Sequence, residues 1–176
     1  MRELAHLAGI SLGATAEAVQ ALADNGHLLA GDPERQLIAV PELAMKWIES
    51  FRTRLLPSLK TLTFTGAKIS AVLDYVAHGP GTEMVAGEAA ADTIRRAETV
   101  TLYTKWPPTA LVRTLALTRS ADAPNIFLRE TFWHEDLFDT PFAPPLLTAA
   151  ELIASGDPRL QEAAQVELRR AGLVLP

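Results

Sequence analysis

The sequence predicts an α+β protein with an N-terminal winged helix-turn-helix, followed by a small α/β domain that carries C-terminal helices. Three observations predict this fold class. Two apolar helical stripes flank a glycine-containing turn near the N-terminus and precede a hairpin pattern; strand and helix patterns then alternate between residues 61 and 129; and two sharply delimited helices follow residue 147. A proline-containing junction at residues 57–60 divides the chain into predicted domains 1–58 and 59–176.

Residues 1–26 predict two short helices around a tight turn. Ser11 suits the start of the second helix, because a serine hydroxyl accepts a hydrogen bond from the free amides there. Asn25-Gly26 predicts its end. Two short apolar runs around a Gly-Asp-Pro turn then predict a β-hairpin, the wing, from Leu28–Ala30 and Leu37–Val40. A third helix is expected from Pro41 to Pro57, with an apolar stripe of Leu43, Ala44, Trp47, Ile48, Phe51 and Leu55.

The second domain alternates short strands with helices, which predicts a sheet covered by helices. A proline- and aromatic-rich loop is expected over residues 130–145. The β-branched and alternating segments predict strands at residues 61–65, 84–86, 99–103 and 125–129, and the intervening segments predict helices at residues 67–77, 87–94 and 108–117.

Two C-terminal helices are expected to pack on this sheet. Thr148 and Glu151 form a capping-box pattern for the first helix, and Gly156 marks its end. Asp157, followed by Pro158, predicts the start of the second helix. Its expected buried stripe is Leu160, Ala164, Leu168 and Ala171.

The composition is that of a globular cytoplasmic protein. Apolar residues make up 48% and charged residues 21% of the chain. No apolar run approaches the roughly 18 residues that span a bilayer, and Glu3, His6 and Gly9 interrupt any signal-peptide core. With no cysteine, disulfides and thiolate metal sites are excluded. The net charge of −5 argues against binding nucleic acid through bulk electrostatics.

DNA binding is nevertheless suggested by the shape of the N-terminal module, whose second helix would enter the major groove. Thr15 is positioned to touch a phosphate, Gln20 to read an adenine edge and Arg35 to bind from the wing. Residues 1–40 contain two basic and five acidic residues, and the second helix contains no lysine or arginine. The alternative is therefore a degenerate winged helix that serves as a protein-interaction module. The basic group of Lys46, Arg52, Arg54 and Lys60 is expected to be a solvated helix face.

The predicted winged helix lacks its usual first helix, because Met1 begins almost inside the helix pair. Either the module is shortened or another segment covers its core. An uncovered core would expose apolar surface and favour association, so a homo-oligomer is among the expected partners.

No catalytic residue, metal site or cofactor is predicted. A nuclease or nucleotidyltransferase relative would need convergent carboxylates around Glu88, with Glu83 and Asp92 as the nearest acids. Tyr103 stands where such a core needs an acid, and Glu88 is better explained as stabilising a helix N-terminus. The spacing of His134, Glu135, Asp136 and Asp139 matches no known metal motif, so these residues are expected to form a polar loop.

Several blocks in order along the chain resemble the AbiEi-family antitoxins of type IV toxin–antitoxin systems. The most specific block is the run from Leu152 to Arg159 with Glu162-Ala-Ala behind it. The other matching strings are Arg2-Glu-Leu-Ala-x-x-Ala-Gly-x-Ser-Leu-Gly13, Pro41-Glu-Leu with Trp47, Gly87-Glu-Ala-Ala-Ala91, Thr101-Leu-Tyr103, Phe127-Leu-Arg129 and Pro144-Pro-Leu-Leu147.

This resemblance implies an N-terminal winged helix that represses its own operon. It implies a C-terminal domain that counters a nucleotidyltransferase-like toxin, without necessarily binding it, and it implies no catalysis. The resemblance does not assign the DNA-contacting side chains, so Thr15, Gln20 and Arg35 rest on the geometry of the motif alone.

Overall fold

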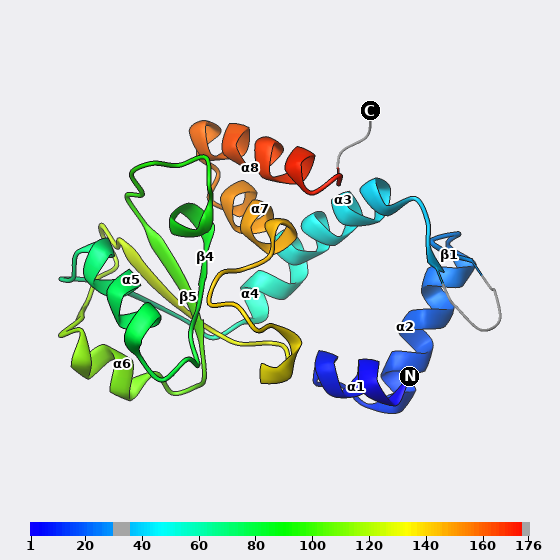
Figure 1. Ribbon diagram of the computed structural model, residues 1–176, viewed down its shortest axis with the longest axis horizontal. Coiled ribbons are helices and arrows are strands. Elements are labelled where there is room, and N and C mark those ends of the chain that lie inside the picture. Colours follow the sequence, from blue (N-terminus) through cyan, green and yellow to red (C-terminus); the bar gives the residue numbers. More distant parts are fainter. Residues whose placement is uncertain (30–35, 174–176) are drawn as a thin grey trace.

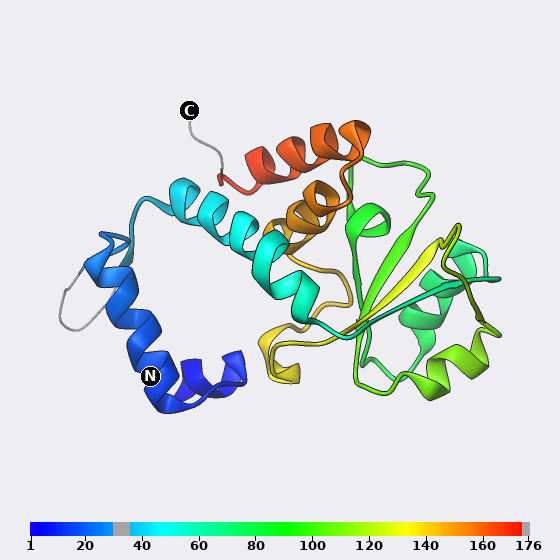
Figure 2. The same ribbon diagram turned by 180° about the vertical axis from the view of Figure 1, so that it is seen from behind.

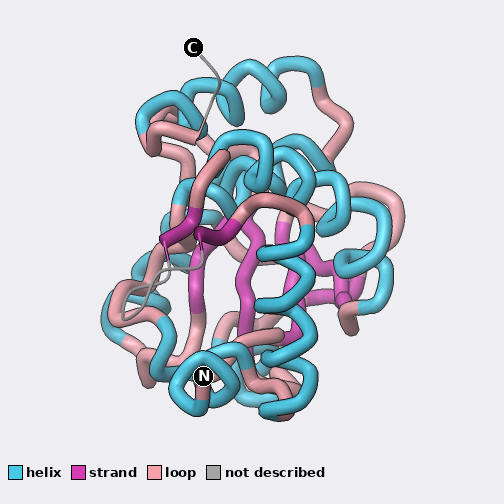
Figure 3. Tube along the Cα trace, turned by 90° about the vertical axis from the view of Figure 1, so that its right-hand side faces the viewer, coloured by secondary structure: helices cyan, strands magenta, loops and turns pink. Residues whose placement is uncertain are grey.

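The computed structural model describes residues 1–29 and 36–173 and shows an α+β protein. A helical arm that contains the N-terminus extends from a second part built around a small mixed sheet (Figure 1). Figure 3 views the molecule from the end of the arm, with the larger sheet behind it. No helix within the described residues is long and apolar enough to cross a membrane.

The arm begins with the two predicted helices, α1 (Arg2–Ala8) and α2 (Leu12–Asp24). Gly9 adopts a left-handed conformation with φ of 66°, which ends α1 and which glycine adopts without steric cost. The Ser11 hydroxyl accepts a hydrogen bond from the Ala14 amide at 3.1 Å, so the predicted N-cap is confirmed. Two short strands, β1 (Leu28–Leu29) and β2 (Gln36–Leu37), pair antiparallel as the hairpin pattern predicted, while the turn between them lies outside the described residues.

The arm is joined to the rest of the molecule by a long, nearly continuous helical segment. It consists of α3 (Val40–Ser50), a π-helical turn η1 (Phe51–Leu55) and the short α4 (Leu56–Ser58). The predicted start near Pro41 is confirmed, and the helical segment ends just beyond Pro57.

The sheet has five strands in the order β4-β5-β7-β3-β6, and only the central pair β5–β7 is parallel. Four of these strands were predicted from the sequence: β3 (Thr61–Thr65), β4 (Met84–Ala86), β5 (Val100–Thr104) and β7 (Ile126–Glu130). The fifth, β6 (Thr118–Arg119), was not predicted, because two residues leave too little pattern.

Helices α5 (Ile69–His78) and α6 (Thr109–Thr114) confirm two of the predicted helical segments, although α6 is shorter than expected. The helix expected over residues 87–94 is instead a single 3₁₀ turn, η2 (Gly87–Ala90). The loop expected over residues 130–145 contains another, η3 (Glu135–Leu137).

Each face of the sheet carries its own apolar core, since successive strand residues point to opposite faces. Val85 and Leu102 belong to the core that α5 and α6 cover. Their neighbours Met84, Ala86 and Tyr103 belong to the opposite core, which α7 and α8 cover (Figure 2). Of the C-terminal helices, α7 (Pro145–Ala154) packs on the sheet as predicted, whereas α8 (Pro158–Arg170) packs mainly against α7.

The capping box predicted for α7 is wrong. The helix starts at Pro145, so Thr148 and Glu151 lie within it and are buried. The Thr148 hydroxyl donates to the Ala143 carbonyl at 3.3 Å, and the Glu151 carboxylate faces the sheet instead of the helix start. By contrast, Asp157 caps α8 as expected, accepting from the Arg159 amide at 2.8 Å. Ala171, expected in the buried stripe of α8, is exposed at its C-terminal end.

The core under α7 extends across the predicted domain boundary. Ile48 and Phe51 come from the helical segment before residue 58, yet they belong to the same core cluster as Leu152 and Leu168. The second half of the α3–α4 segment is thus packed with the C-terminal helices.

Candidate nucleic-acid interface and buried charge clusters

Little of α2 is buried in the pair of helices α1 and α2. Thr15 is the one residue of α2 classed as buried, at 4% exposure. Its hydroxyl donates to the Ser11 carbonyl at 2.9 Å, one turn earlier. In this structure Thr15 therefore supports the turn between the two helices and does not offer its hydroxyl at the surface.

Gln20 lies on the exposed face of α2, where a side chain is free to meet another molecule. Its side-chain amide donates to Asp24 Oδ1 at 2.8 Å, so contact with a base would replace this exposed hydrogen bond. Arg35, the third predicted DNA-contacting residue, lies outside the described residues.

The arm also exposes apolar surface. A groove between α2 and α3 is lined by Ala18, Ala21, Leu22, Leu43 and Met45. The large apolar side chains exposed on the arm are Met1, Leu4, Ile10, Leu12, Leu29, Leu37 and Met45.

The three carboxylates considered for a nuclease-like centre each have a different environment. Asp92 is exposed and pairs with Arg170 at 3.1 Å. Glu83 is buried beside the loop that follows η3, whereas Glu88 lines a separate hollow and pairs with Arg159. Within the described residues, none of the three belongs to a group of acidic or histidine side chains close enough to share a metal ion. The hypothesis of a nuclease or nucleotidyltransferase relative required these carboxylates to converge, and the structure does not bring them together.

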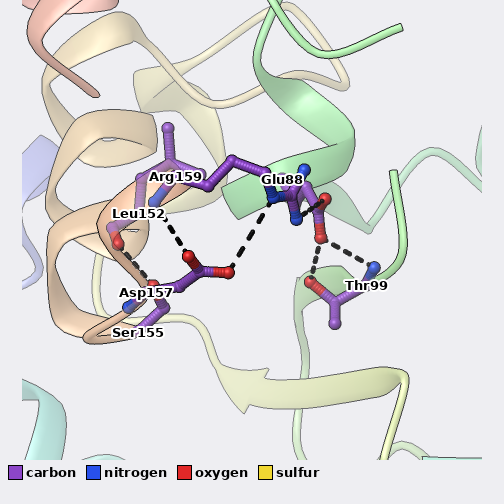
Figure 4. Close-up of polar contacts among 6 residues, drawn as sticks. All are labelled: Glu88, Thr99, Leu152, Ser155, Asp157 and Arg159. Carbon is purple, nitrogen blue, oxygen red and sulfur yellow. Dashed lines mark hydrogen bonds and ion pairs between the residues drawn. The ribbon is translucent and has the colours of Figure 1, made fainter. Parts of the chain in front are cut away.

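Glu88 is held in a polar cluster between η2 and α8 (Figure 4). One carboxylate oxygen accepts from the Arg159 guanidinium at 2.8 Å. The other accepts from both the backbone amide and the hydroxyl of Thr99, each at 2.9 Å. The Glu88 side chain is only 1% exposed, so its charge is matched by these donors and not by water. The sequence pattern predicts that Glu88 stabilises a helix N-terminus, but in the structure its carboxylate forms an ion pair with Arg159 of α8.

Gly87 fixes the direction of this side chain. Its φ of +66° is unfavourable for any residue with a Cβ. A Cβ at this position would also lie 3.2 Å from the Thr101 hydroxyl on β5, closer than an ordinary contact. The Gly-Glu pair is therefore a structural unit, in which the glycine permits the turn that buries the glutamate.

Burial acts to raise the pKa of Glu88, but the hydrogen bonds from Arg159 and Thr99 outweigh it and hold the pKa below its ordinary value. We expect Arg159→Ala to lower the free energy of unfolding by about 1–3 kcal/mol near pH 7, because a buried carboxylate loses its ionic partner. A carboxyl with a lowered pKa stabilises the fold above its ordinary pKa and loses that contribution as the pH falls. Urea unfolding from about pH 7 to about pH 3 should therefore show the variant and the native chain converging in acid.

The matched control is Arg169→Ala, which removes an exposed arginine from the same helix. Within the described residues, its Nε donates to the exposed Gln165 carbonyl and pairs with no carboxylate, so we expect a change within about 0.5 kcal/mol. A pH-independent loss in Arg159→Ala would contradict the assignment of the effect to the Glu88 carboxylate.

A second buried cluster joins β5, β7 and α7. Glu151 accepts from the Tyr103 hydroxyl at 2.5 Å and from the Arg129 guanidinium at 3.0 Å. Burial raises the pKa of Glu151 despite the nearby positive charge. Burial and the Glu151 carboxylate together raise the pKa of Tyr103, so its hydroxyl remains a donor.

The Glu88 cluster and the Glu151 cluster border the same hollow, whose volume is about 400 Å³. Their side chains come from segments that lie far apart in the sequence. Glu88, Tyr103, Arg129 and Arg159 come from four different blocks of the family resemblance. Sequence reasoning used these blocks as markers but did not pair their charges. The sequence shows acidic and basic residues in these separate segments, but it does not show which acidic residue pairs with which basic one.

Comparison with known proteins identifies one family. A family model described as "Transcriptional regulator, AbiEi antitoxin, Type IV TA system" matches residues 36–171, well over half of the chain. The match covers β2, the whole sheet and both C-terminal helices, while α1 and α2 precede it. No curated protein and no solved structure matches the chain.

Proposed function

The chain belongs to the AbiEi antitoxin family of type IV toxin–antitoxin systems, and from this membership we propose that it is an antitoxin-like transcriptional regulator. It would bind operator DNA through a winged helix and neutralise a nucleotidyltransferase-like toxin through its C-terminal domain. The family match over residues 36–171 is the observation that carries this proposal. Acting on its own operon, the protein would work in the cytoplasm and would need no catalytic residue.

The DNA-binding part of the proposal places α2 in the major groove and the β1–β2 hairpin against the backbone. Gln20 is an exposed polar residue of α2 that we assign to base contact, and Arg35, which precedes β2 in the sequence and lies outside the described residues, would contact a phosphate. Thr15 would reach a phosphate only by leaving the Ser11 carbonyl, so its first role is to hold the turn.

We expect Gln20→Ala to weaken binding to the operator about tenfold, since a bidentate contact to adenine contributes roughly 1–3 kcal/mol of discrimination. Binding to unrelated DNA should change little, because phosphate contacts supply the affinity there. Electrophoretic mobility shifts over a salt series measure both affinities, with the DNA upstream of the operon as one probe and unrelated DNA as the other. Gln161→Ala is the matched control, because Gln161 is equally exposed but lies on α8. The DNA-binding proposal fails if the native chain gives no sequence-dependent shift at low salt.

The antitoxin part is tested separately in cells that express the neighbouring toxin. Co-expression of the full chain should restore growth, and Gln20→Ala should restore it equally well while losing repression. If a chain that represses its operon leaves the toxin fully active, the antitoxin role is contradicted while the DNA-binding role stands.

The second candidate function is a protein-interaction module whose winged helix does not bind DNA. The exposed apolar side chains of the arm and the excess of acidic over basic residues in positions 1–40 favour it. Light scattering discriminates between the two functions: a chain that remains monomeric at high concentration and shifts its operator argues against the interaction module.

A further inference from the structure

The contact between the arm and the sheet domain contains two histidines and an aspartate that are far apart in the sequence. His6 comes from α1, while His134 and Asp136 come from the start of η3. Figure 2 shows α1 beside this loop, with η3 at its tip. Among the described residues, no other group of three or more histidine, cysteine, aspartate or glutamate side chains places its ligand atoms within 4.8 Å of one another.

The three ligand atoms lie within 4.8 Å of one another, and two of their separations are close to those of a tetrahedral metal centre. Asp136 Oδ2 lies 3.2 Å from His6 Nε2 and 3.2 Å from His134 Nδ1. In a tetrahedral site with zinc–nitrogen and zinc–oxygen bonds near 2.0–2.1 Å, neighbouring ligand atoms are about 3.3 Å apart. The three side chains thus need little rearrangement to surround one ion.

The side-chain chemistry also fits. Two imidazoles and one carboxylate form a donor set that takes zinc and other late first-row divalent ions. The two histidine rings lie with their centroids 3.9 Å apart, and one nitrogen of each ring lies 3.2 Å from the Asp136 carboxylate. All three side chains are at least one-third exposed, so an ion can enter from solvent and keep a water as its fourth ligand.

Coordination would replace existing contacts of the ligand atoms, among them the 3.2 Å contact between His6 Nε2 and Asp136 Oδ2. His134 Nδ1 accepts from the Asp136 amide at 3.3 Å, and coordination through that nitrogen would take over its lone pair. This hydrogen bond is long, so its loss is small compared with a metal–nitrogen bond.

We propose that His6, His134 and Asp136 bind a divalent transition-metal ion of the zinc class, which ties α1 to the loop after the sheet. Without the ion, the described contacts there include a backbone hydrogen bond from His134 to the Leu7 carbonyl at 2.9 Å and the His6–Asp136 contact. The ion would link one residue of the arm to two of the sheet domain. Occupancy would therefore fix the orientation of the helix-turn-helix relative to the second part of the molecule.

The direct test is titration of the full chain, free of any histidine tag, with Zn²⁺ in a calorimeter. We expect one saturable site per chain, and Co²⁺ should give the visible absorption of a four-coordinate ion at the same stoichiometry. His6→Ala and Asp136→Asn should each weaken binding at least about tenfold, since even outer-shell changes cost that much at metal sites. His78→Ala is the matched control, because His78 is exposed and, in the part of the chain that the structure describes, its side chain bonds to the Asp74 backbone carbonyl.

A separate measurement tests whether the ion ties α1 to the loop that contains η3. Zn²⁺ should slow hydrogen exchange at the His134 amide, which bonds to Leu7, in the native chain but not in His6→Ala. Circular dichroism of the variants separates loss of a ligand from loss of the fold. The proposal is overturned if neither ion binds saturably, or if the site survives in His6→Ala, His134→Ala and Asp136→Asn alike. It is also overturned if His78→Ala weakens binding as strongly as these changes do.

Discussion

Arg129→Met should lower the free energy of unfolding by about 3–5 kcal/mol near pH 7, because it leaves the buried Glu151 carboxylate without a counter-charge. The Arg129 and Glu151 side chains are 13% and 3% exposed, so water does not replace the guanidinium. Methionine keeps much of the apolar stem, which limits the effect of lost packing. Urea denaturation monitored by the fluorescence of the three tryptophans measures the change.

The control is the same substitution in a Glu151→Gln background. The neutral amide still accepts from the Tyr103 hydroxyl and carries no charge that needs Arg129, so the cost of Arg129→Met should shrink sharply. The single variant should also recover as the pH falls. Burial already raises the pKa of Glu151, and a carboxyl with a raised pKa destabilises the fold as the pH rises through its unfolded value. An equal loss in both backgrounds and at every pH would show that packing, not charge, dominates at Arg129.

The sequence predicted most reliably those features whose cause is local. Ser11 and Asp157 were identified as helix caps because their side chains bond to amides two or three residues away. Gly9 and Gly156 were identified as breaks because their positive φ angles suit glycine. Four of the five strands of the sheet were found because their apolar or β-branched residues recur in short, bounded runs, whereas β6 is too short to show such a run.

The errors arise where distant partners decide the outcome. Thr148 and Glu151 have the spacing of a capping box, but Pro145 starts the helix earlier and places the pair inside it. The true partners of Glu151, Arg129 and Tyr103, lie 22 and 48 residues away. Such pairings follow from the order of the strands and the packing of the helices, and the hydrophobic periodicity of the sequence does not predict either of these.

The candidate sites show the same contrast between local features, which the sequence predicts, and contacts with distant residues, which it does not. The helix-turn-helix was recognisable as a pattern, yet which face of α2 is exposed depends on α1 and the turn, so Thr15 is buried and Gln20 is exposed. His6 had no partner visible in the sequence, because His134 and Asp136 follow it by about 130 residues. The division of the chain at residue 58 remains a prediction based on the proline-containing junction alone.

Phe51→Ala tests that division and should cost about 3–5 kcal/mol. Phe51 is 1% exposed, stacks on Trp47 with ring centroids 5.4 Å apart, and lies in the core beneath α7. Removing the ring opens a cavity between the helical segment of the arm and the C-terminal helices, and the loss appears in the unfolding of the whole chain. Thermal or urea unfolding followed by circular dichroism gives the magnitude.

Met45→Ala is the control on α3, since Met45 is 45% exposed and should change stability by no more than about 0.5 kcal/mol. If Phe51→Ala gives one cooperative transition at lower stability, residues 40–58 belong energetically to the sheet domain, and only α1, α2 and the hairpin form a separate module. If it instead gives two transitions, with the sheet domain unchanged, the boundary at residue 58 is correct. The first result is expected, because the Phe51 ring contributes its buried area to the core of α7 and not to the open groove beside α2.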